Sequence, residues 1–169
     1  SSGPPPAERT IDDACESRLL NAFDNSAFDS VVIMDGETVI FRAGDSLAPS
    51  NVASVRKSIV SVLFGMAVDQ ELIELDQTLR DLGIDDASNP LTEAEKDATV
   101  RQIMQARSGI YLPALGQDWP NAERGIHEAG EAYWYKNWDF NVLSTIFEQE
   151  IGQSLEEATM SWLAEPLGM

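Results

Sequence analysis

Residues 54–68 read SVRKSIVSVLFGMAV, and this run predicts a helix too apolar to lie on the surface of a globular protein. Two side chains in its first turn suggest chemistry. Ser54 and Lys57 are three residues apart, so they lie on one helical face and the Lys57 amine can reach the Ser54 hydroxyl. A serine nucleophile needs a nearby base, and apolar surroundings penalise a permanent charge on the amine. The alternative is a helix N-cap serine beside a lysine that extends to solvent.

The composition fits one soluble globular domain. The chain has 169 residues, of which 43% are hydrophobic and 24% charged. Twenty-nine acidic residues against 11 basic ones give a formal net charge of -18. Nucleic acids and anionic membranes are therefore poor partners, and we interpret the acidic residues as a solvated coat. No membrane span is expected, since Arg56, Lys57 and Asp69 bound the apolar helix.

The N-terminal residues and the lone cysteine leave the compartment open. Residues 1–9, which begin SSGPPP, lack the charged-then-apolar pattern of a signal peptide and read as a linker, a tag remnant or a mature end after cleavage. Cys15 is the only cysteine, so it cannot form an internal disulfide, and packing is its expected role. A periplasmic or secreted location is slightly favoured over a cytoplasmic one.

The first part of the chain predicts a helix and a hairpin. Thr10 opens a helix whose apolar residues recur at helical spacing up to Phe23. The runs VVIM (31–34) and ETVIF (37–41) flank Asp35-Gly36, a dipeptide that strongly favours a hairpin turn. Two strands alone are marginal in water. Either the domain is helical with a small ribbon, or further strands belong to residues outside this sequence.

Capping boxes and terminal glycines delimit the later helices. The boxes, a Ser or Thr followed three residues later by Glu or Gln, are Thr99 with Gln102 and Ser154 with Glu157. The first opens a helix over residues 100–107, which Gly109 ends with a left-handed cap, and another helix ends at Gly152. Residues 112–131, with two prolines and three glycines, form a long loop of the kind that often walls a site.

A second chemical group precedes the helix that ends at Gly152: YWYKNWDF, residues 133–140. A tyrosine hydroxyl is normally a weak base, but beside a cationic amine its phenolate is stabilised, so Tyr135 can exchange protons. The Asn137 side chain offers an acceptor and donors to a substrate amide or to a neighbouring lysine. The alternative is an aromatic packing cluster in which Asn137 caps the helix.

No metal or cofactor is expected. His127 is the only histidine, and no cysteine or paired carboxylate lies at ligand spacing from it. Asp85-Asp86 and Glu156-Glu157 are interpreted as solvated charge and helix caps rather than as a glycosidase pair. Three aromatic residues are expected in the core or in a pocket wall: Tyr111, Trp134 and Trp138.

The two chemical groups together resemble a known family. Ser54-Val55-Arg56-Lys57 resembles the Ser-x-x-Lys motif of the serine β-lactamase and penicillin-binding protein superfamily. Tyr135-Lys136-Asn137 resembles the Tyr-x-Asn motif of its branch of class C β-lactamases, D-Ala-D-Ala carboxypeptidases and esterases. Residues 107–110 (RSGI) and 165–169 (EPLGM) also resemble that branch, so the resemblance covers about residues 10–169. A lone Ser-x-x-Lys occurs by chance, whereas both motifs in this order and separation are specific.

The resemblance implies an α+β fold of the β-lactamase/transpeptidase type, of which this chain supplies mostly the helical region with an N-terminal helix and β-hairpin. It also implies catalytic roles. Ser54 becomes acylated, and its backbone N–H supplies half of the oxyanion hole. Lys57 holds the proton network that activates the serine. Tyr135 is the general base and protonates the leaving group, and Asn137 orients Lys57 and the substrate. Whether Lys57 or Tyr135 formally takes the proton stays open, because a coupled pair titrates as a unit.

One part of the family pattern is missing. The third motif, Lys or His followed by Thr or Ser and then Gly, lies in the family on a later strand that gives the other oxyanion N–H. No such triplet follows Tyr135. We therefore expect residues 10–169 to be an incomplete domain, whose partner is the remaining C-terminal part of the same domain and whose remaining sheet strands are absent from this chain. These residues alone then hold an incomplete site.

The leading hypothesis is a serine hydrolase that cleaves an ester or amide, including possible β-lactams, through an acyl-enzyme on Ser54. A chain at -18 repels carboxylates unless local cations compensate, so small esters or amides are favoured over β-lactams. The candidate cations are Arg56, Arg124 and Lys136. The alternatives are a non-catalytic penicillin-recognising sensor or binding module, and a helical interaction domain without chemistry.

Overall fold

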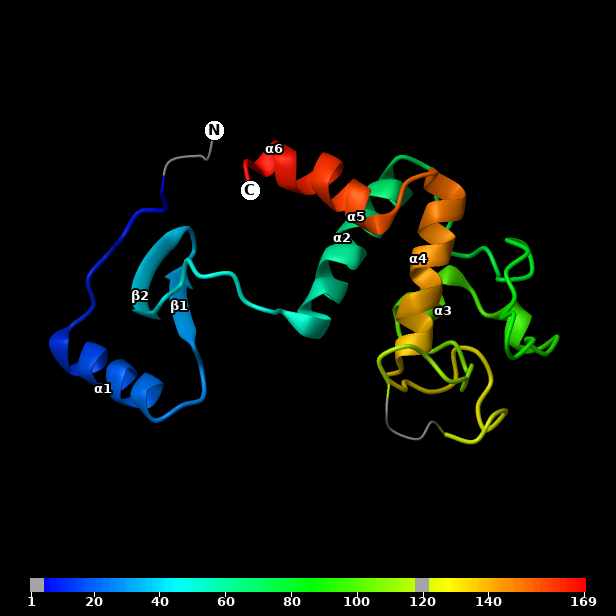
Figure 1. Ribbon diagram of the computed structural model, residues 1–169, viewed down its shortest axis with the longest axis horizontal. Coiled ribbons are helices and arrows are strands. Elements are labelled where there is room, and N and C mark those ends of the chain that lie inside the picture. The colour runs from blue at the N-terminus through cyan, green and yellow to red at the C-terminus, as the bar shows by residue number, and fades with distance from the viewer. Residues whose placement is uncertain (1–4, 118–121) are drawn as a thin grey trace. The chain divides into compact units, whose positions relative to one another are not determined.

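The computed structural model describes residues 5–117 and 122–169, and the chain divides into two compact units (Figure 1). Unit 1 is Ser1–Val52 and unit 2 is Ala53–Leu167. Among the helices of the described ranges, none combines the length and apolarity that a membrane crossing requires.

Unit 1 contains one helix and one hairpin: α1 (Asp13–Asp24), β1 (Ser30–Asp35) and β2 (Thr38–Gly44). The two strands pair antiparallel with Asp35 opposite Thr38, so the predicted hairpin is confirmed. Gly36 supplies the positive φ of 59° that this tight turn requires. A bulge between Ile33 and Met34 shifts the register by one residue.

The start of α1 differs from the prediction at Thr10. The Asp12 carboxylate accepts a hydrogen bond from the Cys15 N–H and caps the helix, so the first helical residue is Asp13. Residues before the helix run beside β2 instead, because Val39 exchanges backbone hydrogen bonds with Ala7 and Arg9.

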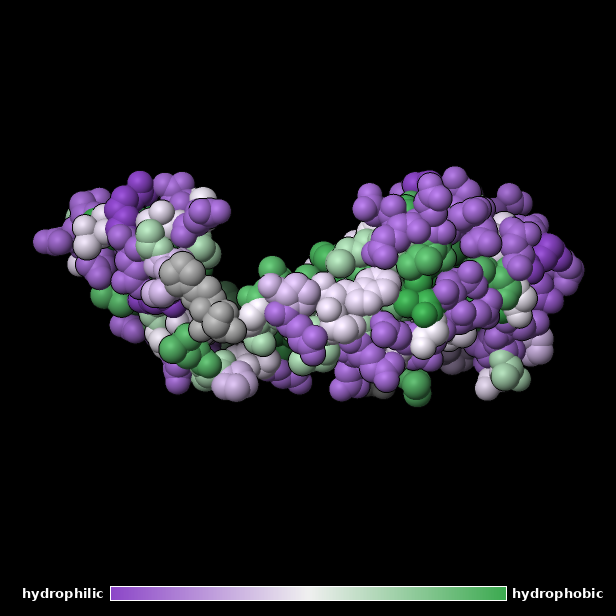
Figure 2. Space-filling view, turned by 90° about the horizontal axis from the view of Figure 1, so that it is seen from above, coloured by the Kyte–Doolittle hydropathy of each residue, from purple (hydrophilic) through white to green (hydrophobic). Residues whose placement is uncertain are grey.

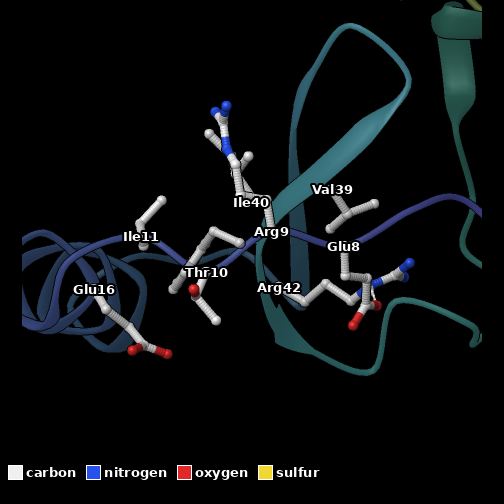
Figure 3. A pocket seen from close by; sticks show the side chains of 9 residues that line it. Glu8, Arg9, Thr10, Ile11, Glu16, Val39, Ile40 and Arg42 are labelled. Atoms are coloured by element: carbon white, nitrogen blue, oxygen red, sulfur yellow. Dashed lines mark ion pairs between the residues drawn. The ribbon is translucent and has the colours of Figure 1, made fainter.

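A hollow of about 240 Å³ lies beside β2 in unit 1 (Figure 3). Arg42 forms an ion pair with Glu8 at its edge, at 3.4 Å. The motif residues Ser54, Lys57 and Tyr135 all belong to unit 2, and none of them lines this hollow.

Unit 2 is helical. Its elements are η1 (Ala53–Val55), α2 (Arg56–Asp69), η2 (Glu95–Asp97), α3 (Val100–Met104), α4 (Asn137–Ile151), α5 (Leu155–Ala158), the π-helical η3 (Thr159–Ala164) and α6 (Glu165–Leu167). With the hairpin of unit 1, the chain has the predicted α+β composition, and the sheet of the described residues has two strands.

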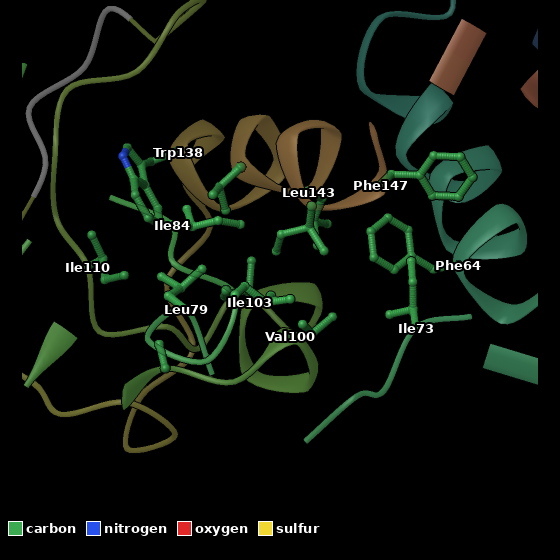
Figure 4. Close-up of a cluster of buried hydrophobic side chains, with 14 of the residues drawn as sticks. Phe64, Ile73, Leu79, Ile84, Val100, Ile103, Ile110, Trp138, Leu143 and Phe147 are labelled. Atoms are coloured by element: carbon green, nitrogen blue, oxygen red, sulfur yellow. The ribbon is translucent and has the colours of Figure 1, made fainter. Parts of the chain in front are cut away.

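The core of unit 2 forms where α2, α3 and α4 present their apolar faces to one another (Figure 4). The Phe64 ring of α2 meets the Phe147 ring of α4 with centroids 5.5 Å apart. Helix α2 is buried on one side only, however, since Val62 is 47% exposed. The expectation of a helix too apolar for any surface position is therefore too strong.

Polar residues dominate the face of unit 2 seen in Figure 2, with small hydrophobic areas between them. Glu95 and Asp139 are the carboxylates among the buried polar residues of the described chain. Most of the acidic excess therefore lies where water solvates it.

Both predicted capping boxes are present. Thr99 and Gln102 bond reciprocally at the start of α3, and Ser154 and Glu157 do so at the start of α5. Gly152 closes α4 with a φ of 75°.

The end of α3 is where the prediction over residues 100–107 is wrong. The helix stops at Met104, and Ala106 already has a left-handed φ of 54°. Gly109 also has a left-handed φ, of 73°, but it lies beyond the helix rather than capping it. A Cβ at this position would lie 2.8–2.9 Å from backbone atoms of residues 127–129. Gly109 therefore allows two backbone segments to approach closely.

Gly109→Ala is expected to lower the free energy of unfolding by about 2–4 kcal/mol, because it adds both left-handed strain and a backbone clash. Gly65→Ala is the matched control. Gly65 lies inside α2 with nothing within 4 Å of a built Cβ, so alanine there should raise stability by about 0.5–1 kcal/mol. Urea denaturation of both variants measures the difference, and equal effects would contradict the close approach at Gly109.

Candidate active site

Ser54 lies in the short turn η1, directly before α2. The preceding residue, Ala53, has a φ of 43°, in the left-handed region that residues with a side chain rarely adopt. Such strain is common beside functional groups. The N-cap position of α2 is Val55, and the Ser54 hydroxyl faces Lys57 and Tyr135 instead. The alternative of Ser54 as a helix cap is therefore wrong.

The Lys57 amine is the centre of the cluster. Its Nζ donates to Ser54 Oγ at 3.2 Å, to Tyr135 OH at 2.8 Å and to Asn137 Oδ1 at 3.1 Å. An ammonium has three N–H donors, so all three are used. Nζ also lies 4.7 Å from the centroid of the Phe140 ring. Lys57 is held inside the site rather than extended to solvent.

Tyr135 closes a triangle with the other two side chains. Its hydroxyl donates to Ser54 Oγ at 3.0 Å. The hydrogen bond from Lys57 lowers the pKa of the Tyr135 phenol below its ordinary value, and the contact with Ser54 acts in the same direction. The ring packs against Phe140 at 5.6 Å. The phenol therefore lies within hydrogen-bond distance of the serine hydroxyl, and the neighbouring amine stabilises its ionised form.

Asn137 is the first residue of α4, and its side chain is fixed at both ends. Oδ1 accepts from Lys57, while Nδ2 donates to the carbonyl oxygen of Gly116 at 2.7 Å. Its backbone N–H donates to Gln117 Oε1 at 2.7 Å, so Gln117 caps α4 from a distant loop. The alternative of Asn137 as the cap is wrong, since the N-cap position is Lys136.

The loop predicted over residues 112–131 does reach the cluster. Leu115, Gly116 and Gln117 all bond to Asn137. Residues 118–121 of that loop lie outside the described residues. Gln117 was not singled out from the sequence, because a cap supplied from 20 residues away leaves no local pattern.

Two of the three candidate cations are already neutralised. Lys136 is fully buried and pairs with Asp139 at 2.8 Å. The Arg124 guanidinium binds Glu95 through two nitrogens, at 2.5 and 2.8 Å. Of the three, Arg56 is exposed and takes part in neither of these ion pairs. Of the candidate cations, Lys136 and Arg124 are therefore already engaged by carboxylates of this chain.

Asp139 is a buried carboxyl behind the cluster. Burial raises its pKa to about 6, although Lys136 and Ser108 oppose that shift. The folded protein therefore keeps the Asp139 proton at pH values where the unfolded chain, with a pKa near 3.8, has released it. The resulting contribution to stability is fully present below about pH 4 and is lost as the pH rises through about 6.

The melting temperatures of the parent and of Asp139→Asn, compared between about pH 4 and pH 7, should show this dependence. We expect the advantage of the parent to shrink as the pH rises. Subtracting the melting temperature of Asp139→Asn from that of the parent at each pH removes the contributions of the other carboxylates. An advantage that grows with pH would mean that the Asp139 pKa is lowered instead.

The remaining sequence candidates have structural roles. Tyr111 and Trp138 are buried, whereas Trp134 is 38% exposed. His127 Nδ1 lies 2.7 Å from the Tyr111 hydroxyl. Within residues 5–117 and 122–169, no three His, Cys, Asp or Glu side chains are grouped to hold a metal ion.

Asp86 accepts from Trp138 Nε1 at 2.9 Å and from two backbone N–H groups, so it organises its loop.

A pocket of about 290 Å³ lies along α4 in unit 2. Trp138, Val142 and Thr145 line it from the helix, and Leu115 lines it from the loop that contacts Asn137. Ser54, Lys57 and Tyr135 do not line it. It is therefore a neighbour of the cluster and not the cluster's own cavity.

Comparison with known proteins assigns the chain to a family. The family model described as Beta-lactamase matches residues 30–169. The chain belongs to the Beta-lactamase family. Both motifs, the hairpin, and residues 107–110 and 165–169 lie inside the matched range. No match is found among curated protein sequences.

Solved structures of the serine β-lactamase and penicillin-binding protein superfamily share the fold. A provisionally named 6-aminohexanoate-dimer hydrolase from Bacillus anthracis is 16% identical, with a TM-score of 0.73 over 96% of this chain and 52% of that one. A D-stereospecific amidohydrolase from a Streptomyces species is 19% identical, with a TM-score of 0.68 over 94% and 55%. A mutant class C β-lactamase is 20% identical, with a TM-score of 0.65 over 92% and 48%.

These matches establish a β-lactamase/transpeptidase-like α+β fold. The chain spans about half the length of the structures that it matches.

Proposed function

We propose that the protein is a serine hydrolase that cleaves an ester or amide through an acyl-enzyme on Ser54. The observation that carries the proposal is the triangle of Ser54 Oγ, Lys57 Nζ and Tyr135 OH, with sides of 3.2, 2.8 and 3.0 Å. A hydroxyl, an amine and a phenol in mutual hydrogen-bond contact form a nucleophile with its base and the group that orients the base. Membership in the Beta-lactamase family supports the same chemistry.

The proposed reaction starts from Tyr135 as the phenolate, paired with the Lys57 ammonium. Tyr135 accepts the Ser54 proton while Oγ bonds to the substrate carbonyl carbon, and the carbonyl oxygen becomes an oxyanion. The Ser54 backbone N–H is one donor to that oxyanion. When the intermediate collapses, the bond to the leaving alcohol or amine breaks, and that group takes the proton from Tyr135.

The second half of the proposed reaction reverses these roles. Water attacks the acyl carbon and gives its proton to Tyr135. The bond between the acyl carbon and Ser54 Oγ then breaks, and Oγ recovers the proton. Throughout, Asn137 Oδ1 and Lys57 keep their contact, so the amine stays directed at the phenol.

The second oxyanion donor is proposed to come from a C-terminal part of the same domain. The relatives of known structure are about twice as long as the segment that they share with this chain. The test of the reaction therefore uses the protein at its full natural length, so that a missing donor is not mistaken for a missing function.

Charge favours a neutral substrate over an anionic one. Lys136 and Arg124 are both paired with carboxylates, and the chain has a net charge of -18. A substrate carboxylate would meet little compensating charge from these residues. We therefore propose small esters or amides as substrates in preference to β-lactams.

The test offers p-nitrophenyl acetate and the chromogenic cephalosporin nitrocefin to the full-length protein, and follows both colour release and intact protein mass. The proposal expects hydrolysis of the ester with a short-lived acyl adduct on Ser54. A stable adduct from the cephalosporin without turnover would identify the penicillin-recognising sensor instead. The hydrolase proposal would be rejected if neither chromogenic compound is turned over and if neither of them, nor a fluorophosphonate, leaves an adduct on the protein.

A further inference from the structure

Lys136 separates the two motif residues Tyr135 and Asn137 and points the opposite way. Its backbone is extended, with φ -150° and ψ 144°. Successive side chains of an extended segment point to opposite sides, so Tyr135 and Asn137 share one side and Lys136 occupies the other. The shared side faces Lys57, which both residues contact. The Lys136 side chain enters the core and is 0% exposed.

The buried amine meets a buried carboxylate. Lys136 Nζ donates to Asp139 Oδ2 at 2.8 Å, and Ser108 Oγ donates to Asp139 Oδ1 at 2.6 Å. Ser108 Oγ also accepts from the Ile110 N–H at 3.1 Å. The Lys136 amine lies 5.3 Å from the centroid of the Tyr111 ring. These contacts join the start of α4 to residues 108–111.

A second tie lies on the other side of Tyr135. The Trp134 N–H donates to the Ala106 carbonyl oxygen at 2.9 Å, and the Trp134 ring meets the Tyr111 ring edge-on at 5.8 Å. The segment that presents Tyr135 is therefore held on both sides of the tyrosine to residues 106–111.

A buried ion pair is a costly way to fill a core, because both ions lose their hydration and apolar residues of similar volume are often as stable. Among the described residues, neither Lys136 nor Asp139 hydrogen-bonds to Ser54 or Lys57 through its side chain, so the pair stands outside the proposed proton transfers. The ion pair does, however, fix the orientation of residue 136, because the amine must point at the Asp139 carboxylate. That orientation sets where the Tyr135 hydroxyl lies.

We propose that Lys136 and Asp139 are positioning residues, whose buried ion pair holds Tyr135 and Asn137 in contact with Lys57. This inference rests on the proposed function, since the contacts that it protects are those of the proposed proton network. A misplacement of about 1 Å in a reacting group can cost about 100-fold in rate. The contacts at stake, of 2.8 and 3.1 Å, leave no slack of that size before the hydrogen bonds break.

The test replaces the pair by apolar side chains of similar volume, in the double variant Lys136→Met with Asp139→Leu. Thermal denaturation reports whether the protein folds. The ultraviolet absorbance of phenolate, taken as the difference from a Tyr135→Phe version of each protein, reports the pKa of Tyr135. The rate of p-nitrophenyl acetate hydrolysis is the third measurement. The control removes an exposed pair of unit 2 in the same way, Arg101→Met with Asp76→Leu.

We expect the double variant to fold, the Tyr135 pKa to rise towards its ordinary value, and kcat to fall about 10- to 100-fold. The control should leave the Tyr135 titration unchanged. A folded double variant in which Tyr135 titrates as in the parent overturns the inference. If the double variant does not fold, Asp139→Asn, which keeps the shape of the side chain, is judged by the same titration. A parent that fails to hydrolyse the ester, but whose Tyr135 titration still depends on the pair, would reject the hydrolase and keep the positioning role.

Discussion

Ser54→Ala is expected to lower the rate of ester or amide cleavage by at least about 1000-fold. The Ser54 hydroxyl receives hydrogen bonds from both Lys57 and Tyr135, and alanine removes the atom on which the two converge. Neither neighbour replaces it, because the Lys57 amine and the Tyr135 hydroxyl are held to each other at 2.8 Å. The measurement is kcat/KM of the full-length protein with the substrate that it turns over fastest.

A serine on the exposed side of α2 provides the control. Ser61 is exposed and lies outside the hydrogen-bonded triangle, so Ser61→Ala should keep parental kcat/KM. The intact mass of Ser54→Ala after incubation with a fluorophosphonate should show no adduct, whereas Ser61→Ala should be labelled. Retention of most activity in Ser54→Ala would remove Ser54 as the nucleophile. Labelling of Ser54→Ala by the fluorophosphonate would place the reactive group elsewhere.

Elements whose ends are fixed by neighbouring residues could be predicted from the sequence. The turn at Asp35-Gly36 is one case, since the dipeptide itself favours the required dihedral angles. The capping boxes at Thr99 and Ser154 are others, because both partners of each hydrogen bond lie within four residues. The length of α3 could not be predicted, since the left-handed backbone of Ala106 depends on contacts with residues far along the chain.

The candidate site also combines contacts between residues near in sequence, which could be predicted, with contacts that could not. Ser54 and Lys57 could be paired from their spacing on one helix, and the structure joins them at 3.2 Å. The link to Tyr135, 78 residues after Lys57, came from a family resemblance and has no local signal. The Lys136 partner is only three residues away, but the sequence does not tell which side of the segment is buried. The sequence alone therefore leaves Lys136 as a candidate cation for a substrate carboxylate.

Tyr135→Phe is expected to lower kcat/KM by about 100- to 10000-fold, the usual contribution of a general acid or base. The substitution removes one oxygen and keeps the ring, so the packing against Phe140 and the position of the ring beside Lys57 should persist. A large loss in a folded variant would then come from the missing proton acceptor. Tyr133→Phe is the matched control, because Tyr133 lies in the same segment and is 64% exposed.

The pH profile separates a base from a merely structural hydroxyl. Because Lys57 lowers the pKa of Tyr135, the phenolate forms at a pH below the ordinary value of 10.0, and the rate should rise with pH through that lowered pKa. Tyr135→Phe should lose this rising limb while keeping a low, flat rate. Lys57→Met should instead move the limb of whatever activity remains to higher pH, since the phenol then loses the hydrogen bond that stabilises its ionised form. A rising limb that persists unchanged in Tyr135→Phe would assign the titration to another group and leave Tyr135 outside the proton transfers.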